Sequence, residues 1–232
     1  MNIRFYSIVI LIFTIIFLSA CSSDSDNKAS VPQQNDNHGE NDGDSEQAVA
    51  AEDAYTVVID PGHGGKDNGA TGVDGSYEKE FTLSLGKKIQ SLLNEEPEIN
   101  VLMTRDDDRF ISQKSLERPE FANENEADLY LSLHQDSFDD PDVSGTESFY
   151  YDDDSLDVAK IIQKHVVDTT GFNDRGIKRE NLFVLRDSDM PSVLIEVGYL
   201  TNPDEQEKMN SDNFQEQIAQ SIVDGIEEYR ED

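Results

Sequence analysis

Short apolar runs and amphipathic segments alternate along this chain from about residue 56 to residue 230. A strand that is covered on both faces needs apolar side chains on both, so short runs of β-forming residues predict buried strands. We expect strands at 57–59, 100–104, 128–134, 145–151, 182–185 and 192–197. Apolar residues three or four positions apart predict helices at 77–94, 114–125, 156–167 and 214–229. This alternation predicts a single α/β domain, with a mostly parallel mixed β-sheet flanked by helices on both faces.

Three of the expected strands end on a side chain that can bind a metal or carry a proton. The first runs into Asp60-Pro61-Gly62-His63, where proline and glycine stop the strand. The strand at 128–134 ends on His134, and the apolar run at 193–195 is followed by Glu196. Open α/β sheets bind ligands at the carboxyl ends of their strands. We therefore expect His63, His134 and Glu196 to lie at one edge of the sheet.

Glu78 is the candidate for a third metal ligand beside the two histidines. Zinc in a catalytic site takes three protein ligands and leaves one position for water. Glu78 follows the loop after His63 and stands at the first turn of an expected helix, from which its side chain can point back to the strand ends. The helix dipole also favours a carboxylate at this position, and for Glu78 alone this explanation would suffice. Beside His63 and His134, we interpret Glu78 as a zinc ligand.

The first 20 residues have the pattern of a lipoprotein signal peptide. Arg4 precedes an apolar run at 8–18 that is short for a membrane-spanning helix, and Leu18-Ser19-Ala20-Cys21 closes it. Small residues before Cys21 are typical of the site at which a bacterial lipoprotein is cleaved and lipidated. The alternative is an ordinary signal peptide with an incidental cysteine. Because Cys21 is the only cysteine, no intrachain disulfide is possible.

Residues 22–54 are acidic and polar, with almost no apolar side chains, which predicts a disordered tether before a catalytic domain at 55–232. The whole chain has 50 acidic and 18 basic residues, a formal net charge of −32. This charge argues against nucleic-acid binding, which needs basic patches. It also disfavours attachment of the protein surface to anionic lipids. It fits a protein outside the cell in a high-salt or alkaline setting, or serves solubility.

The chain resembles the zinc-dependent N-acetylmuramoyl-L-alanine amidases of the bacterial cell wall over residues 56–230. The resemblance begins with Ile59-Asp60-Pro61-Gly62-His63-Gly64-Gly65 and Glu78-Lys79. It ends with Glu196-Val197-Gly198-Tyr199-Leu200-Thr201-Asn202. Between these lie Thr104-Arg105, Asp108, Leu116-Glu117-Arg118, Ala122-Asn123, Ala127-Asp128, Ser132-Leu133-His134, Gly145, Arg175-Gly176-Ile177-Lys178, Val184-Leu185-Arg186 and Pro191. One departure is Gln135-Asp136, where the family usually has Ala-Asn or Ala-Asp, and it affects the rim of the pocket.

The resemblance implies one Zn²⁺ per chain, held by His63, Glu78 and His134, with Glu196 as the catalytic carboxylate. It implies hydrolysis of the amide between N-acetylmuramic acid and L-alanine in peptidoglycan. Two other functions stay open: a non-catalytic wall-binding or regulatory lipoprotein on the same fold, and a zinc peptidase acting on the stem peptide. We expect a monomer on the outer face of the cell membrane, attached through a lipid on Cys21.

Other polar residues in these motifs have structural interpretations as well. Arg105, Arg118 and Arg186 either pair with carboxylates or contact the substrate. We expect Asn123 and Asn202 to brace loops. His165 lies in the expected helix at 156–167, where we expect a surface or half-buried side chain that binds no metal.

Overall fold

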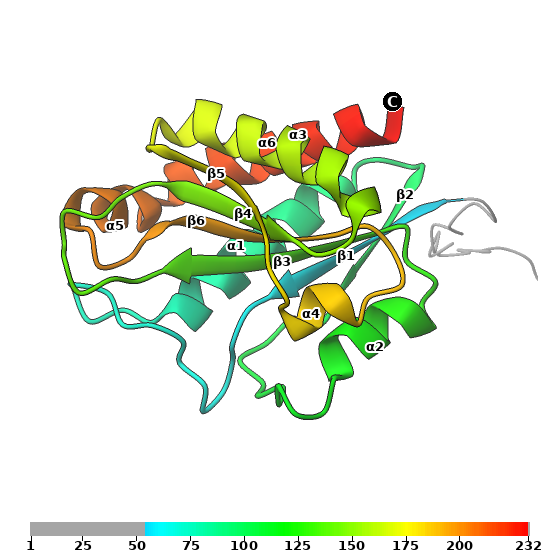
Figure 1. Ribbon diagram of the computed structural model, residues 1–232, viewed down its shortest axis with the longest axis horizontal. Helices are drawn as coiled ribbons and strands as arrows, with labels where there is room; N and C mark the ends of the chain where they lie inside the picture. The colour runs from blue at the N-terminus through cyan, green and yellow to red at the C-terminus, as the bar shows by residue number, and fades with distance from the viewer. Residues whose placement is uncertain (1–53, 232) are drawn as a thin grey trace, which may run out of the picture. The chain divides into compact units, whose positions relative to one another are not determined.

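A computed structural model describes residues 54–231 of the protein. The expected signal peptide, Cys21 and most of the expected tether lie outside these residues. Six strands form one sheet in the order β2-β1-β3-β6-β4-β5 (Figure 1). They are β1 (Tyr55–Pro61), β2 (Ile99–Met103), β3 (Leu129–Asp136), β4 (Thr146–Tyr150), β5 (Asp174–Arg179) and β6 (Ser192–Tyr199).

Strand direction divides the sheet into two parts. Strands β2, β1, β3 and β6 are parallel, whereas β4 pairs antiparallel with β6 and parallel with the edge strand β5. The carboxyl ends of β1, β3 and β6 therefore meet the amino ends of β4 and β5 at one edge. The prediction of a mostly parallel mixed sheet is confirmed.

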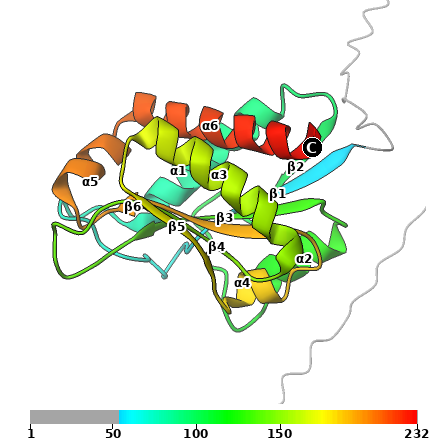
Figure 2. The same ribbon diagram turned by 45° about the horizontal axis from the view of Figure 1, so that its top comes forward.

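Helices cover both faces of the sheet, as predicted (Figures 1 and 2). On one face, α1 (Glu78–Leu93), α3 (Leu156–Thr170) and α6 (Asp212–Glu231) share a core with the strands. On the other face, a smaller apolar cluster lies under α2 (Glu117–Glu124) and the short α4 (Phe183–Arg186). A 3₁₀ turn, η1 (Asp153–Ser155), precedes α3, and α5 (Pro203–Met209) follows β6. Within residues 54–231, none of the helices is both long enough and apolar enough to cross a membrane.

The strand predicted at 182–185 is wrong, because α4 occupies this segment. A four-residue apolar run cannot by itself distinguish a strand from one buried turn of helix. Here Val184 and Leu185 are buried by the helical turn against the smaller cluster, while Leu182 precedes the helix in an extended conformation.

Besides the 3₁₀ turn η1, one strand and one helix were not predicted from the sequence. Strand β5 reads Asp-Arg-Gly-Ile-Lys-Arg, and its mostly exposed pattern follows from its place at the edge of the sheet. Helix α5 has sequence signals that could have revealed it. Asn202 caps it by accepting hydrogen bonds from the N–H groups of Asp204 and Glu205, and Pro203 occupies its first turn.

Candidate metal centre

The structure brings together the three residues that the sequence pointed to as metal ligands. His63 follows β1, Glu78 is the first residue of α1, and His134 lies in β3. One ligand atom from each lies within 4.8 Å of the others, and the group could hold a metal ion. The Glu78 carboxylate bridges the two rings, with Oε2 3.0 Å from His63 Nε2 and Oε1 2.7 Å from His134 Nδ1.

The backbone fixes the position of the Glu78 carboxylate. Oε2 accepts a hydrogen bond of 2.9 Å from the N–H of Ala70, and Oε1 accepts one of 3.2 Å from the N–H of Gln135. Burial by itself raises the pKa of Glu78, but hydrogen bonds and charges of His134 and His63 outweigh burial and hold the pKa well below its usual range. The side chain is therefore ionised, which is the form that a metal requires.

Glycine at position 62 leaves room for the His134 ring beside the turn that follows β1. A Cβ atom added at Gly62 would lie 2.3 Å from the nearest atom of the His134 ring, Cε1. Any side chain there would displace that ring. Gly62 therefore contributes to the position of a ligand that belongs to the neighbouring strand.

Glu196 lies beside His134 across the β3–β6 pair, where the two residues are register partners. Its Oε2 atom is buried and has no hydrogen-bond partner within residues 54–231. Burial raises the pKa of Glu196 well above its usual range, and the negative charges of Glu78, Asp136 and Glu147 add to this effect. A bound cation would offset these charges and stabilise the ionised form.

These features fit zinc. Two imidazoles and one carboxylate form a donor set of catalytic zinc sites, and such sites keep a position for water. A cavity of about 350 Å³ reaches the centre and is lined by His63, His134 and Glu196. The Oε2 atom of Glu196, which has no hydrogen-bond partner among the described residues, belongs to a side chain that lines this cavity.

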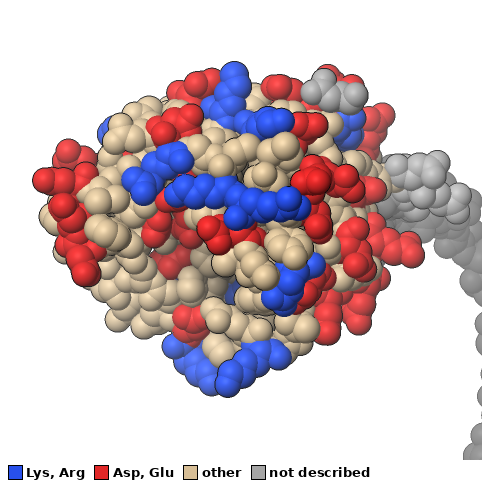
Figure 3. Space-filling view, in the orientation of Figure 1, with Lys and Arg blue, Asp and Glu red and all other residues tan. Residues whose placement is uncertain are grey.

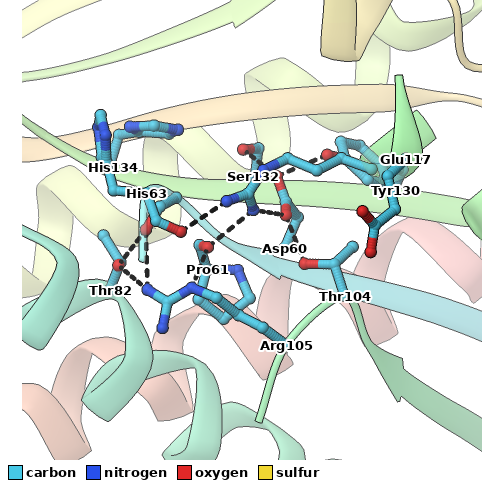
Figure 4. Close-up of polar contacts among 12 residues, drawn as sticks. Asp60, Pro61, His63, Thr82, Thr104, Arg105, Glu117, Tyr130, Ser132 and His134 are labelled. Atoms are coloured by element: carbon cyan, nitrogen blue, oxygen red, sulfur yellow. Dashed lines mark hydrogen bonds and ion pairs between the residues drawn. The ribbon is translucent and has the colours of Figure 1, made fainter. Parts of the chain in front are cut away.

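Two buried arginines, Arg105 and Arg118, form an arginine clamp on the turn that carries His63. Arg118 donates to the carbonyl oxygens of Pro61 at 2.9 Å and of His63 at 2.6 Å. Arg105 donates to Pro61 O at 2.9 Å and to Gly62 O at 2.8 Å. In Figure 4 these contacts converge on the segment between Asp60 and His63. The clamp holds this turn, in which His63 has a left-handed backbone with φ of 62°.

Asp60 is the buried anion that balances the clamp. It pairs with Arg118 and accepts hydrogen bonds from Thr104 at 2.5 Å, Tyr130 at 2.6 Å and Ser132 at 2.8 Å (Figure 4). Burial would raise the pKa of Asp60, but the Arg118 guanidinium and these hydrogen bonds hold it below its usual range. Arg118 thus pairs with a carboxylate, which was one of its two interpretations. Arg105 instead donates to backbone carbonyl oxygens and forms no ion pair within residues 54–231.

The other polar residues singled out from the sequence lie outside the metal centre. Arg186 is 40% exposed and pairs with Asp187. Asn123 accepts from the N–H of Asp189 and donates to Asp187 O, so it braces a loop as predicted. Asn202 caps α5 and donates to Pro141 O. His165 is partly exposed and contacts Glu228, in agreement with a surface or half-buried position.

Several residues near the centre were missed in the sequence. The cavity is also lined by Ile111, Gln113, Leu182, Phe183, Val184 and Leu194. Their place depends on how a loop and α4 fold over the sheet, and no local pattern gives this. Glu147 was missed as well, although the alternation in 146–150 places it on the same face as Phe149. It is the register partner of Glu196 across the β4–β6 pair.

Comparison with known proteins agrees with this geometry. The fold and the site define an α/β domain in which two histidines and a glutamate near the strand ends could hold a metal ion. Residues 57–228 match the family model of N-acetylmuramoyl-L-alanine amidases. The chain belongs to this family, whose members are hydrolases that act on peptidoglycan of the cell wall.

Two relatives and two solved structures illustrate the similarity. The chain is 37% identical to the uncharacterized protein YqiI of Bacillus subtilis, over 79% of this chain and 88% of YqiI. It is 32% identical to the probable cell wall amidase LytH of Staphylococcus epidermidis, over 75% of this chain, and it spans 58% of LytH. The catalytic domain of the amidase CwlV from Bacillus (Paenibacillus) polymyxa has 40% identity and a TM-score of 0.73, over 76% of this chain and 98% of that domain. An N-acetylmuramoyl-L-alanine amidase from Clostridium difficile 630 has 38% identity and a TM-score of 0.74, over 77% and 98% of the two chains.

Proposed function

We propose that His63, Glu78 and His134 hold one Zn²⁺ and that Glu196 is the catalytic base for hydrolysis of the amide between N-acetylmuramic acid and L-alanine. The observation that carries this proposal is the convergence of the three side chains within 4.8 Å, next to a buried carboxylate oxygen that has no hydrogen-bond partner in the part of the chain that the structure describes. Membership of the family supports the reaction, and the geometry supports the role that we propose for each side chain.

Zinc bound there would polarise the amide carbonyl and lower the pKa of a water molecule. Glu196 takes a proton from the water that attacks the carbonyl carbon, and passes it to the amine of the departing L-alanine as the C–N bond breaks. Glu78 stays ionised throughout, because both its oxygens accept backbone hydrogen bonds. A cavity of about 350 Å³ is near the lower end of ligand-pocket sizes, so much of a muramoyl peptide must lie on the surface beside it.

Metal binding and proton transfer are separated by comparing ligand variants with Glu196→Gln. We expect His63→Ala, Glu78→Ala and His134→Ala each to abolish tight zinc binding and amidase activity, because a three-ligand site has no spare donor. Glu196→Gln should bind zinc normally and lose about two to four orders of magnitude in kcat. His165→Ala is the matched control and should bind zinc and cleave peptidoglycan as the unchanged protein does.

Two results would contradict these roles. Loss of zinc in Glu196→Gln would make this carboxylate a ligand. Full activity of a ligand variant after exhaustive chelation would remove zinc from the mechanism. Mass spectrometry of the digested wall distinguishes the reactions. The amidase releases peptides with a free L-alanine amine, whereas a peptidase cuts within the stem peptide and a non-catalytic protein releases nothing.

We further propose that the domain, residues 55–232, is held on the outer face of the membrane by a lipid on Cys21 and the acidic segment 22–54. The pattern of residues 1–21 and the net charge of −32, which disfavours contact of the domain with anionic lipid, support this arrangement. Two or more acyl chains suffice for stable attachment. Cys21→Ser should release the protein from membranes or leave an uncleaved precursor. Unchanged cleavage and membrane fractionation would exclude the lipid anchor.

A further inference from the structure

Strand β5 carries a group of cations on an otherwise acidic protein. Arg175, Lys178 and Arg179 lie within its six residues, whereas the chain as a whole has 18 basic residues against 50 acidic ones. Figure 3 shows Lys and Arg side chains gathered on the face that β5 crosses in Figure 1. In a protein of net charge −32, such a group of cations indicates that this part of the surface attracts negatively charged groups.

Two of these cations, Arg175 and Lys178, are held in place by Glu147 and are called the cation pair below. Glu147 is 3% exposed. Its carboxylate accepts a hydrogen bond of 3.0 Å from Arg175 Nε and also pairs with the Lys178 ammonium. The hydroxyl of Tyr199 donates to the same carboxylate at 2.9 Å, and the Arg175 guanidinium lies over the Tyr199 ring. The buried carboxylate thus fixes two charged groups at the surface.

Cross-strand neighbours connect the metal centre to the cation pair. His134 pairs with Glu196 across β3 and β6, and Glu196 pairs with Glu147 across β6 and β4. Paired residues on adjacent strands point to the same face of the sheet. Two strand spacings separate β6 from β5, a distance of about 10 Å. An extended peptide covers this distance in about three residues.

The cation pair has capacity for a further anion. The side chains of Arg175 and Lys178 are 35% and 43% exposed. Within residues 54–231, the two Nη groups of Arg175 make no hydrogen bond, and Glu147 is the only carboxylate in an ion pair with either cation. Asp136 accepts a hydrogen bond from the N–H of Ser137 and forms no ion pair with either cation within the described residues.

We propose that Arg175 and Lys178 bind a free carboxylate of the stem peptide, two to three residues beyond the amide that is cleaved next to Glu196. This inference rests on the proposed function, because Glu196 marks the position of the scissile bond. The peptide then crosses β6, β4 and β5 on the face of the sheet that carries α2 and α4, and its carboxylate meets the guanidinium and the ammonium. The glycan is a less suitable occupant, since its sugar rings carry no charge that cations would select.

Lys178→Gln tests the proposal with Glu147 still paired to Arg175. The matched control is Lys160→Gln, because Lys160 is 54% exposed on α3, which packs on the opposite face of the sheet. The substrates are a soluble N-acetylmuramoyl tripeptide with free carboxylates on its second and third residues, and the same compound with these groups converted to amides. Each protein is assayed with zinc on both compounds.

We expect Lys178→Gln to raise KM for the acidic tripeptide by about three- to tenfold, because the variant loses a partly exposed hydrogen bond between charged groups. The value of kcat should stay nearly unchanged. KM for the amidated compound should not change, so the preference for the acidic form should shrink. KM for the acidic form should also rise with salt in the unchanged protein, and rise less in the variant. Lys160→Gln should change none of these values.

The outcomes separate this inference from the proposed function. If the unchanged protein cleaves neither compound, the proposed function fails. If it cleaves both and Lys178→Gln leaves KM unchanged, or changes both compounds equally, cleavage stands and the carboxylate site is wrong. A fall in kcat on both compounds would mean that Lys178 only supports the fold around Glu147.

Discussion

The arginine clamp and the cation pair both face a buried carboxylate near the metal centre, yet they use their donors differently. The clamp is 1% and 5% exposed, and its donors go to Asp60 and to backbone carbonyl oxygens of the turn that carries His63. The cation pair is 35% and 43% exposed, and among residues 54–231 the Nη groups of Arg175 make no hydrogen bond. A basic residue beside an active site is thus a substrate-binding candidate only where the backbone has not already taken its donors.

Among changes to the arginine clamp, Arg118→Met should lower the free energy of unfolding most. Removing the guanidinium leaves the Asp60 carboxylate buried without its cation, which destabilises a protein by about 3–5 kcal/mol. Urea denaturation of the purified protein measures the loss. The double variant Arg118→Met with Asp60→Asn should recover much of it. If Arg118→Met lowers the free energy of unfolding by less than about 1 kcal/mol, the Arg118–Asp60 pair contributes no more than a surface salt bridge does.

Arg105→Lys should have an intermediate effect. Lysine keeps the charge but cannot donate to Pro61 O and Gly62 O with one planar group. We expect a loss of about 1–3 kcal/mol from unsatisfied buried carbonyls. We also expect weaker zinc binding, because the His63 turn is less restrained. Titration with a zinc indicator checks this second effect, and unchanged affinity would show that the clamp stabilises the fold without positioning the ligand.

Acid unfolding should depend on Asp60 and gives a smaller difference. Its pKa is lower in the folded protein than in the unfolded chain, so it contributes stability above the unfolded value of about 4. That contribution is lost as the pH falls through the folded pKa. Asp60→Asn should therefore show a shallower loss of stability below about pH 4 than the unchanged protein. Denaturation curves at a series of pH values measure the slope, and parallel slopes would contradict the assignment.

Lys178→Gln should have the smallest effect on stability. The ammonium is partly exposed, Glu147 keeps Arg175 as a partner, and such pairs contribute about 0–1 kcal/mol. The melting temperature, measured beside that of Lys160→Gln, should change little. A loss as large as that of Arg118→Met would place the cation pair in the same structural class as the clamp.

The sequence revealed the metal centre because short local signals mark it. Proline and glycine end β1 before His63, an apolar run ends on His134, and Glu78 opens a strongly amphipathic helix. Strand β5 carries no such signal, since an edge strand with few buried residues has no apolar pattern. Glu147 lies in a predicted strand, but its sequence neighbours do not reveal its partners. The role of Glu147 and β5 depends on β4 running antiparallel to β6, a tertiary arrangement that no local window contains. The place of Phe183 beside the cavity also depends on tertiary structure, because the apolar run of α4 fits a strand as well as a helix.

The close approach at Gly62 has a consequence for the genetics of this protein. In a saturation-mutagenesis scan scored by wall hydrolysis, residue 62 should tolerate no substitution. Even alanine places an atom 2.3 Å from the His134 ring. This position should therefore group with the ligand positions in such a map, although glycine has no side chain with which to coordinate a metal. Revertants of Gly62→Ala should then be sought among residues that hold the turn after β1, since a change in the ligands themselves offers no relief.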